Sequence, residues 1–391
     1  MKKLLLASTA ATLFSAAAFA EEVKVGVILG YTGPIESLTP DMAASAELAF
    51  KEISDSGMFL DGSTITPVRA DSTCVDAAAA SAAAERLITS DGIVAIMGAD
   101  CSGVTGAVLS NVAVPNGVVM ISPSATSPGL TTVEDNDLFF RTSPSDARQG
   151  AVLADVLEEK GITSVAVTYT NSDYGKGLSD AFEASYDGEI TINTSHEDGK
   201  ADYSAEIAAL ASAGGEMLVV LGYVDQGGKG IIQASADTGA FDMFLLGDGM
   251  YGDSLIADLG DVVEGSIGIV PWAEGAGTDA FNALGEAAGI NVSSAYTRES
   301  YDAGALIALA MAKGGAATKE AVAANVLDVA NAPGEPILPG ELDKALKILS
   351  EGGDINYVGA TNVELIGPGE AAGSYRYYTI KDGGFETVSI R

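Results

Sequence analysis

Short apolar runs alternate along this chain with amphipathic helical stretches, and this alternation constrains the fold more than any other feature. Apolar residues recur at helical spacing from Met42 to Ile53 and from Ala80 to Ile88. Near-continuous apolar strands separated by helices are typical of parallel sheets covered on both faces. The sequence therefore predicts an α/β fold with parallel-sheet cores. The predicted strands are Val23 to Leu29, Ile93 to Gly98, Val118 to Ile121, Val165 to Tyr169, Met217 to Gly222, Phe244 to Gly247 and Ser266 to Val270.

The length of the chain indicates more than one core. A chain of 391 residues exceeds the size at which a single hydrophobic core usually stops growing. The strand and helix rhythm starts anew after Phe139, where an extended segment leads into a helix from about Asp146. A helix-rich segment follows Trp272, and the tail from Tyr357 has the pattern of short strands. We therefore expect two domains, with a first crossing between them near residue 142.

Residues 1–20 have the pattern of a secretory signal peptide. Lys2 and Lys3 precede an apolar stretch, and Ala18-Phe19-Ala20 forms an A-x-A cleavage site. The apolar stretch is short for a bilayer span, and no cysteine that could carry a lipid stands near the cleavage point. We expect cleavage after Ala20 and a soluble mature protein in the periplasm.

Export affects the expected oxidation state of Cys74 and Cys101, the two cysteines of the chain. Cysteines of an even count usually pair in an oxidising compartment. We therefore expect a disulfide between them, with two buried thiols as the alternative. Two cysteines are too few to form a disulfide scaffold, so the core must supply most of the stability.

Charge and motif content exclude several classes of function. The chain has 20 Lys and Arg against 54 Asp and Glu, a net charge of -34 that disfavours nucleic acid and anionic membranes as partners. His196 is the single histidine, which argues against a histidine triad or a zinc cluster. The Gly-rich stretch from Gly222 to Gly230 lacks the Ser or Thr that a phosphate-binding loop places after its Lys. We expect no catalytic residues, no metal and no cofactor.

Three polar loops directly follow predicted strands: Gly30 to Pro34, Asp100 to Gly103 and Ser122 to Ser127. In open α/β sheets, ligands bind outside the carboxyl ends of the strands. Serine and threonine hydroxyls there can donate hydrogen bonds to an anion such as a carboxylate. Each could instead cap a helix, but three such loops together favour a carboxylate-binding site.

Motifs along the whole mature chain resemble those of periplasmic binding proteins of the Leu/Ile/Val type, the substrate-recognition components of ABC importers. The order and spacing of these motifs make the resemblance strong. The motifs are VKVGVILGYTGPIES, the D-x-x-C of Asp71 to Cys74, MGADCSG, ISPSATSPGLT, FFRTSPSDARQG, DYGKG, LLGDGMY and SYDAGALIAL.

This resemblance implies two Rossmann-like lobes joined by three crossovers, with an amino acid ligand in the cleft between them. Lobe 1 would comprise residues 21–142 and 272–361, and lobe 2 residues 143–271 and 362–391. Closure around the ligand would present the loaded protein to a membrane permease. We expect a monomer that binds and releases its ligand without chemistry.

The resemblance also carries the family's ligand contacts onto numbered positions of this chain. They are Ser102, Ser124 and Thr126 for the α-carboxylate, Tyr223 and, after a one-residue adjustment, Asp248 for the ammonium group, and Tyr174 and Tyr296 as aromatic residues of the cleft. The family's paired cysteines fall on Cys74 and Cys101. Each tyrosine could instead serve packing, and Asp248 could cap the turn at Gly249.

The chain departs from the family at residues near the expected rim of the cleft. Leu38 occupies a position that is commonly aromatic, and Glu36, Arg298 and Asp302 bring charge there. A branched-chain ligand is therefore the main hypothesis, with an aromatic, polar or non-proteinogenic ligand as the alternative. A sensor for a chemoreceptor, an importer component for another small molecule and an exported carboxylate-dependent hydrolase remain as other functions.

Overall fold

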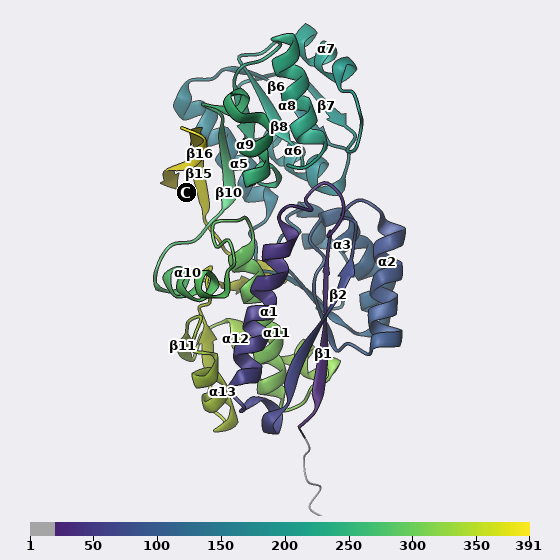
Figure 1. The fold of residues 1–391 in the computed structure, drawn as a ribbon, viewed down its shortest axis with the longest axis vertical. Coiled ribbons are helices and arrows are strands. Elements are labelled where there is room, and N and C mark those ends of the chain that lie inside the picture. Colours follow the sequence, from purple (N-terminus) through teal and green to yellow (C-terminus); the bar gives the residue numbers. More distant parts are fainter. Residues whose placement is uncertain (1–19) are drawn as a thin grey trace, which may run out of the picture.

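The computed structural model describes residues 20–391. The predicted signal peptide, apart from Ala20, lies outside these residues. The chain forms two lobes stacked along its long axis, each built around its own sheet (Figure 1). The sheet of lobe 1 has the strand order β2-β1-β3-β4-β5, and the sheet of lobe 2 has the order β16-β15-β10-β9-β8-β6-β7. The predicted α/β fold with parallel cores in two lobes is confirmed.

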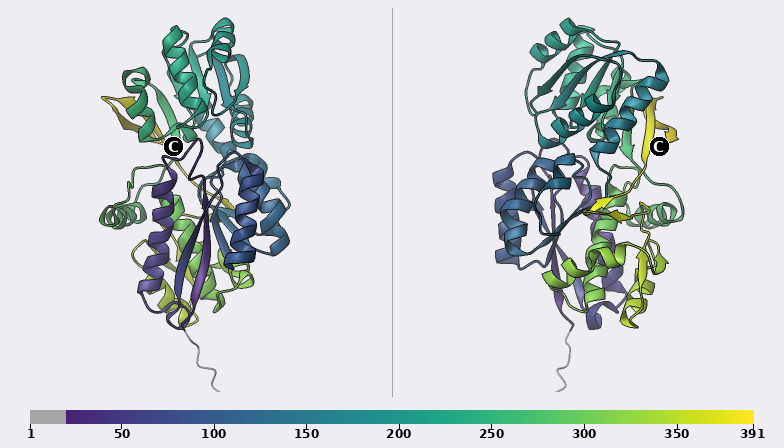
Figure 2. Two further views of the ribbon diagram at one scale, coloured as in Figure 1. Left: turned by 45° about the vertical axis from the view of Figure 1, so that its right-hand side comes forward. Right: turned by 180° about the vertical axis from the view of Figure 1, so that it is seen from behind.

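Lobe 1 is a five-stranded parallel sheet with helices on both faces (Figure 2). Its strands are β1 (Glu22–Leu29), β2 (Thr64–Asp71), β3 (Ala95–Gly98), β4 (Val119–Ser122) and β5 (Phe139–Arg141). Its helices are α1 (Thr39–Asp55), α2 (Ala77–Arg86), α3 (Ser102–Val108), α4 (Val114–Asn116), α10 (Ala276–Ala288), α11 (Thr297–Gly314), α12 (Lys319–Ala330) and α13 (Leu342–Ser350). Helix α11 packs between the sheet and α1, which explains why all of its residues from Thr297 to Met311 are buried.

Lobe 2 is a seven-stranded mixed sheet. Its strands are β6 (Ser164–Thr170), β7 (Glu189–His196), β8 (Met217–Leu221), β9 (Phe244–Leu246), β10 (Ile267–Pro271), β15 (Tyr375–Lys381) and β16 (Gly384–Ile390). The strands from β6 to β10 are parallel, whereas β15 runs antiparallel to both β10 and β16. Its helices are α5 (Asp146–Lys160), α6 (Asp173–Ser185), α7 (Ser204–Ala213), α8 (Gly227–Thr238) and α9 (Asp253–Leu259).

The chain crosses between the lobes three times: after β5, after β10 and before β15. Two small sheets lie on the lobe 1 side of these crossings. They pair β11 (Glu335–Ile337) with β12 (Ile355–Tyr357) and β13 (Leu365–Ile366) with β14 (Glu370–Ala371). The lobe boundaries that we expect from the sequence stay a prediction.

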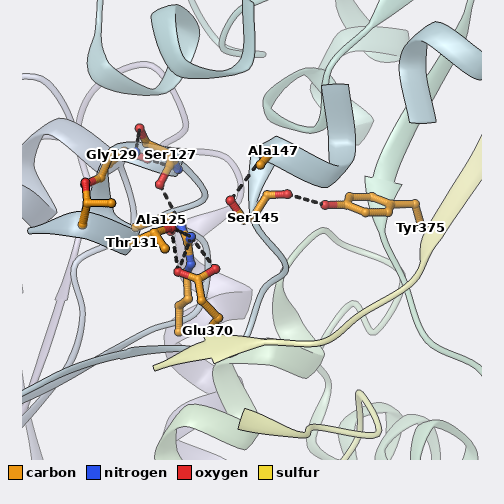
Figure 3. Close-up of polar contacts among 11 residues, drawn as sticks. Ala125, Ser127, Gly129, Thr131, Ser145, Ala147, Glu370 and Tyr375 are labelled. Carbon is orange, nitrogen blue, oxygen red and sulfur yellow. Dashed lines mark hydrogen bonds and ion pairs between the residues drawn. The ribbon is translucent and has the colours of Figure 1, made fainter. Parts of the chain in front are cut away.

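Buried polar contacts tie the first crossing to the third (Figure 3). The guanidinium group of Arg141 is buried at the end of β5 and forms an ion pair with Glu370 at 2.7 Å. It also donates to the carbonyl oxygens of Ala125 and Ser127, at 3.0 and 2.9 Å. The Tyr375 hydroxyl donates to the carbonyl of Ser145 at 3.0 Å. These contacts fix the geometry of the hinge.

Within residues 20–391, no helix combines the length and the apolar character that a membrane crossing needs.

Candidate ligand-binding site

A narrow cavity lies between the two lobes, at the carboxyl ends of strands β3, β4, β8 and β9. Parallel strands bring these ends, and the loops that follow them, to one edge of each sheet. The cavity volume is about 20 Å³, room for about one water molecule. The lining residues are Ile35, Leu38, Asp100, Cys101, Ser102, Ser124, Tyr174, Tyr223, Asp248, Gly249 and Tyr296.

The structure brings most of the expected ligand contacts to this cavity. Seven of them line it: Leu38, Ser102, Ser124, Tyr174, Tyr223, Asp248 and Tyr296. Thr126 does not. It is fully buried behind the cavity wall, where its carbonyl accepts a hydrogen bond from the backbone of Asp146 at 2.9 Å.

Of the residues that we expected to bring charge to the rim, Asp302 and Arg298 lie elsewhere, whereas Glu36 stands between the lining residues Ile35 and Leu38. Asp302 is fully buried and accepts hydrogen bonds from Tyr357 and from the backbone of Ala360 and Thr361. Arg298 lines a different cavity. Glu36 is exposed and accepts from the backbone of Gly33 at 3.3 Å.

The lobe 1 wall carries two serine hydroxyl groups. Ser102 Oγ accepts a hydrogen bond from the backbone N–H of Ser127 at 3.1 Å, so its own proton is left for an acceptor in the cavity. Ser124 Oγ donates to the carbonyl of Asp100 at 3.1 Å. These contacts hold both hydroxyls in place on loops that follow β3 and β4.

Asp100 holds the loops of this wall together by hydrogen bonds. Its carboxylate accepts from the backbone of Gly30 at 2.5 Å, from the backbone of Cys101 at 2.9 Å and from the hydroxyl of Ser72 at 3.0 Å. Burial raises the pKa of this carboxyl, and the three hydrogen bonds lower it. Asp100 also lines the cavity, which we did not expect. The sequence placed it in one of the three polar loops but could not show which way its side chain points.

The disulfide adds a covalent tie to the same wall. Cys74 and Cys101 are bonded, with their Cα atoms 5.2 Å apart, as the sequence predicts. The bond joins the segment after β2 to the segment after β3. It therefore fixes Cys101, and the neighbouring Ser102, at the edge of the cavity.

Asp248 forms the charged part of the opposite wall and is only 1% exposed. It lies in a 3₁₀ turn, Asp248–Met250, directly after β9. One carboxylate oxygen accepts from the hydroxyl of Tyr174 at 2.6 Å, and the other accepts from the hydroxyl of Tyr296. Tyr174 belongs to lobe 2 and Tyr296 precedes α11 of lobe 1, so this carboxylate links the lobes.

The tyrosines of the site are neutral hydrogen-bond donors. Burial raises the pKa of both Tyr174 and Tyr296 well above the usual value, and the negative charge of Asp248 adds to the effect. The ring of Tyr174 stacks on that of Tyr223, with centroids 5.0 Å apart. The pair forms a rigid aromatic wall beside Asp248.

A second buried carboxyl, that of Asp146, lies close enough to Asp248 for the two to influence each other. Burial, and then the charge of Asp248, raise the pKa of Asp146 well above its usual value. The nearby Thr126 hydroxyl lowers this pKa, although neither carboxylate oxygen of Asp146 has a hydrogen-bond partner of good geometry among residues 20–391. Burial also raises the pKa of Asp248. Asp146 does not itself line the cavity, so it acts on the site through its charge interaction with Asp248.

Asp146 begins α5 and was not expected as part of the site. Its sequence motif, SPSDARQG, is compatible with a simple helix start, and only the fold shows that its carboxyl points inward. Within the described part of the chain, no group of three or more His, Cys, Asp or Glu could hold a metal ion.

The sequence profile of the family described as periplasmic binding protein matches residues 22–339. The chain belongs to the periplasmic binding protein family. One relative in sequence is the Leu/Ile/Val-binding protein homolog 3 of Brucella melitensis, which is 34% identical over 273 residues, covering 68% of this chain and 72% of the relative. The resemblance found in the motifs is confirmed, and the family is one of transport binding proteins rather than enzymes.

Two solved structures of the periplasmic binding protein fold show how widely ligands differ within it. The branched-chain amino acid transporter substrate-binding protein of Streptococcus pneumoniae, in complex with isoleucine, has a TM-score of 0.76 at 23% identity and covers 95% of this chain and 99% of its own. A solute-binding protein of an ABC transporter from R. palustris, in complex with 4-hydroxybenzoate, has a TM-score of 0.75 at 18% identity and covers 95% of this chain and 97% of its own. These likenesses extend to the fold alone.

Proposed function

We propose that this protein is the substrate-binding component of an ABC importer and captures a branched-chain amino acid, or a related zwitterion, between its lobes. The observation that carries the proposal is the position of Asp248. Its buried carboxylate lines the same cavity as the Ser102 hydroxyl, on the opposite wall. A tyrosine from each lobe donates a hydrogen bond to this carboxylate and orients it.

In this proposal, the two charges of the ligand are divided between the lobes. The ligand carboxylate accepts a hydrogen bond from the hydroxyl of Ser102, and one from Ser124 if that hydroxyl gives up its bond to the Asp100 carbonyl. The ammonium group pairs with Asp248. Ile35 and Leu38 supply apolar surface for the side chain. Full affinity then requires both lobes, so binding favours the closed state by the difference in affinity between the closed and open states.

The small volume of the cavity means that a ligand enters while the lobes are apart. After closure, the protein would deliver the ligand to a permease of the inner membrane. We propose a periplasmic monomer, with the signal peptide cleaved after Ala20, that returns its ligand unchanged. Lobe boundaries at residues 142 and 271 belong to the same proposal. The expected third boundary at residue 361 lies before the β13–β14 sheet, which stands on the lobe 1 side, so we propose that the third crossing follows Ala371.

A thermal-shift screen followed by calorimetry tests the proposal. The panel contains leucine, isoleucine, valine, phenylalanine and 4-hydroxybenzoate, the last of which lacks an ammonium group. A branched-chain amino acid at 100 times its dissociation constant should stabilise the protein by about 2.7 kcal/mol. Mass spectrometry should recover that amino acid unchanged.

Stabilisation by 4-hydroxybenzoate with no response to any amino acid would overturn the proposed ligand class. Turnover of a bound amino acid would overturn the transport assignment.

A further inference from the structure

Two buried arginines line a second cavity, which shares none of its lining residues with the ligand cavity. It has a volume of about 700 Å³ and lies between the two lobes. Arg298 comes from α11 of lobe 1 and Arg376 from β15 of lobe 2. Trp272, which begins the second crossing, lines the same cavity.

The two guanidinium groups are held over one aromatic ring. Arg298 lies 4.0 Å and Arg376 4.8 Å from the centroid of Trp272. Their side chains are fixed by neutral hydrogen-bond partners. Arg298 donates to the amide oxygen of Asn282 at 3.3 Å, whereas Arg376 donates to the Tyr251 hydroxyl and to the Phe385 carbonyl, both at 2.7 Å.

Both charges are almost completely removed from solvent, since Arg298 is 4% exposed and Arg376 is 7% exposed. Neither forms an ion pair with any carboxylate in residues 20–391, although the chain contains 54 acidic residues. The Nε atoms of both arginines also lack a hydrogen-bond partner in this part of the chain. Arg141, which is equally buried, is by contrast paired with Glu370.

Two acids lie near this positive charge, and within residues 20–391 neither forms an ion pair with Arg298 or Arg376. Asp253 lines the cavity, but its carboxylate accepts a hydrogen bond from the side chain of Asn291 at 3.0 Å. Glu299 follows Arg298 in α11, and burial raises its pKa to about 7, so its carboxyl is partly protonated at neutral pH. Burial lowers the pKa of Arg298, the charge of Glu299 raises it, and the charge of Arg376 adds a smaller lowering.

A buried charge without a counter-ion is costly, and an unpaired buried arginine therefore calls for an anion. Guanidinium groups match carboxylates and phosphates because their donors form a planar fork. We infer that the cavity between Arg298 and Arg376 binds a small multivalent oxyanion, of the dicarboxylate or phosphate class, which contacts both lobes. Trp272 and Tyr251 form its aromatic wall.

This anion site and the ligand cavity are connected through two short segments of backbone. Tyr251 follows the turn that carries Asp248, and Arg298 lies two residues after Tyr296. Each segment therefore contributes residues to both cavities. An anion that holds Arg298 and Arg376 at a fixed separation acts on the same hinge that the ligand closes.

The single tryptophan of the chain makes the site directly observable. Inorganic phosphate and succinate are titrated separately in a buffer without other polyvalent anions, while the fluorescence of Trp272 and the thermal midpoint are followed. We expect a saturable fluorescence change and a higher midpoint with at least one of them. The one that binds more tightly identifies the class.

Arg298→Gln and Arg376→Gln should each weaken the binding of the anion by at least about 30-fold, because truncating one member of a desolvated charge pair is costly. Ser293→Glu, at an exposed position of the cavity lining, is a variant that leaves the arginines intact and introduces a competing carboxylate. It should abolish the fluorescence change in a folded protein. Arg86→Gln, at an exposed arginine paired with Asp91, is the matched control and should behave as the wild type.

The inference fails if neither phosphate nor succinate gives a saturable change up to about 10 mM, a concentration at which a site of even millimolar affinity would be mostly filled. It also fails if Ser293→Glu binds the anion as tightly as the wild type does. These readouts need no amino acid, so they are independent of the proposed function.

Discussion

At the scale of single residues, Asp248 combines two tasks. Its carboxylate carries the negative charge of the cavity, and it accepts hydrogen bonds from Tyr174 of lobe 2 and Tyr296 beside α11 of lobe 1. Because both tyrosine hydroxyls stay neutral, they orient the charge without cancelling it. A ligand ammonium group would therefore meet a carboxylate that is already positioned, which reduces the cost of ordering on binding.

Substitution of Asp248 by Asn should weaken an amino acid ligand by roughly 30-fold or more, since a desolvated ammonium loses its charged partner. Asn has nearly the same shape, so the fold should be retained. Calorimetric titration measures the effect, with Asp258→Asn as a control because Asp258 pairs with Lys229 on the surface. Undiminished affinity in a folded Asp248→Asn protein would remove this residue from the site.

Binding should also release a proton. Burial raises the pKa of Asp248 above its usual 3.8, and burial together with the Asp248 charge raises that of Asp146. The unliganded pair therefore holds a proton at a pH where free carboxyls have lost theirs. An ammonium group beside Asp248 favours the ionised form and lowers its pKa, so affinity should rise with pH above about 4 until the pair is ionised.

Calorimetry in two buffers of different ionisation enthalpy measures the number of protons released. Asp146→Asn should reduce this number, because it removes the neighbouring charge that raises the pKa of the pair. Affinity that is independent of pH, with no proton released, would contradict the coupling of the two acids.

Seven of the expected contact residues line the cavity because their position follows from a simple rule. Polar loops after parallel strands meet at one edge, and the family motifs give the residue numbers. The inward direction of Asp146 and the unpaired state of Arg298 could not be predicted, because both depend on which side chains surround them after folding. In a chain with 54 acidic residues, the sequence alone would predict that every buried arginine forms an ion pair.

At the scale of elements, all seven strands predicted from apolar runs are present, and they differ from prediction by at most about two residues at either end. In the two large sheets, the strands that were not predicted as such are β2, β5 and β7, each at an edge of its sheet, together with the C-terminal hairpin strands expected only as short strands. The short strands β11 and β12 of a small sheet were not predicted either. Strand β5 is buried but only three residues long, whereas β2 and β7 are partly exposed. They therefore lack the continuous apolar run that marks a central strand.

The ion pair between Arg141 and Glu370 joins the first and third crossings, and its loss should destabilise the hinge (Figure 3). Glu370→Gln leaves the buried guanidinium without a counter-charge. Breaking a buried pair costs about 3 to 5 kcal/mol, and because the Glu370 side chain is 12% exposed we expect about 2 to 4 kcal/mol.

The free energy of unfolding in urea measures this effect. Glu386→Gln is the matched control, since Glu386 pairs with Lys381 on the surface, and it should change stability by less than about 0.5 kcal/mol. Equal effects of the two substitutions would show that the crossings do not depend on this pair.

At the scale of the whole molecule, polar contacts between loops of the two lobes hold the cleft closed. The backbone N–H of Asp225 in lobe 2 donates to the carbonyl of Pro34 in lobe 1 at 3.0 Å. The Asp225 carboxylate accepts from the backbone of Ser37 at 2.8 Å and from the hydroxyl of Ser254 at 2.7 Å. Asp225 does not line the ligand cavity, so it can influence binding only through closure.

Asp225→Ala should therefore favour the open form without changing any ligand contact. The contact with Ser37 is exposed, and a hydrogen bond of this kind contributes about 1 kcal/mol net, which corresponds to roughly fivefold in the equilibrium between open and closed forms. Where the open form already predominates without ligand, the ligand must supply this additional free energy to close the lobes, and its dissociation constant should rise by the same factor.

Small-angle scattering should show that ligand reduces the radius of gyration of both proteins, and that the variant needs more ligand to reach the compact form. Asp237→Asn, which alters an exposed acid of lobe 2 that accepts a hydrogen bond from Gln233 within the same helix, separates a loss of charge from a loss of this contact between the lobes. Equal ligand affinity and equal scattering curves for Asp225→Ala and the wild type would show that closure rests on the cavity residues alone.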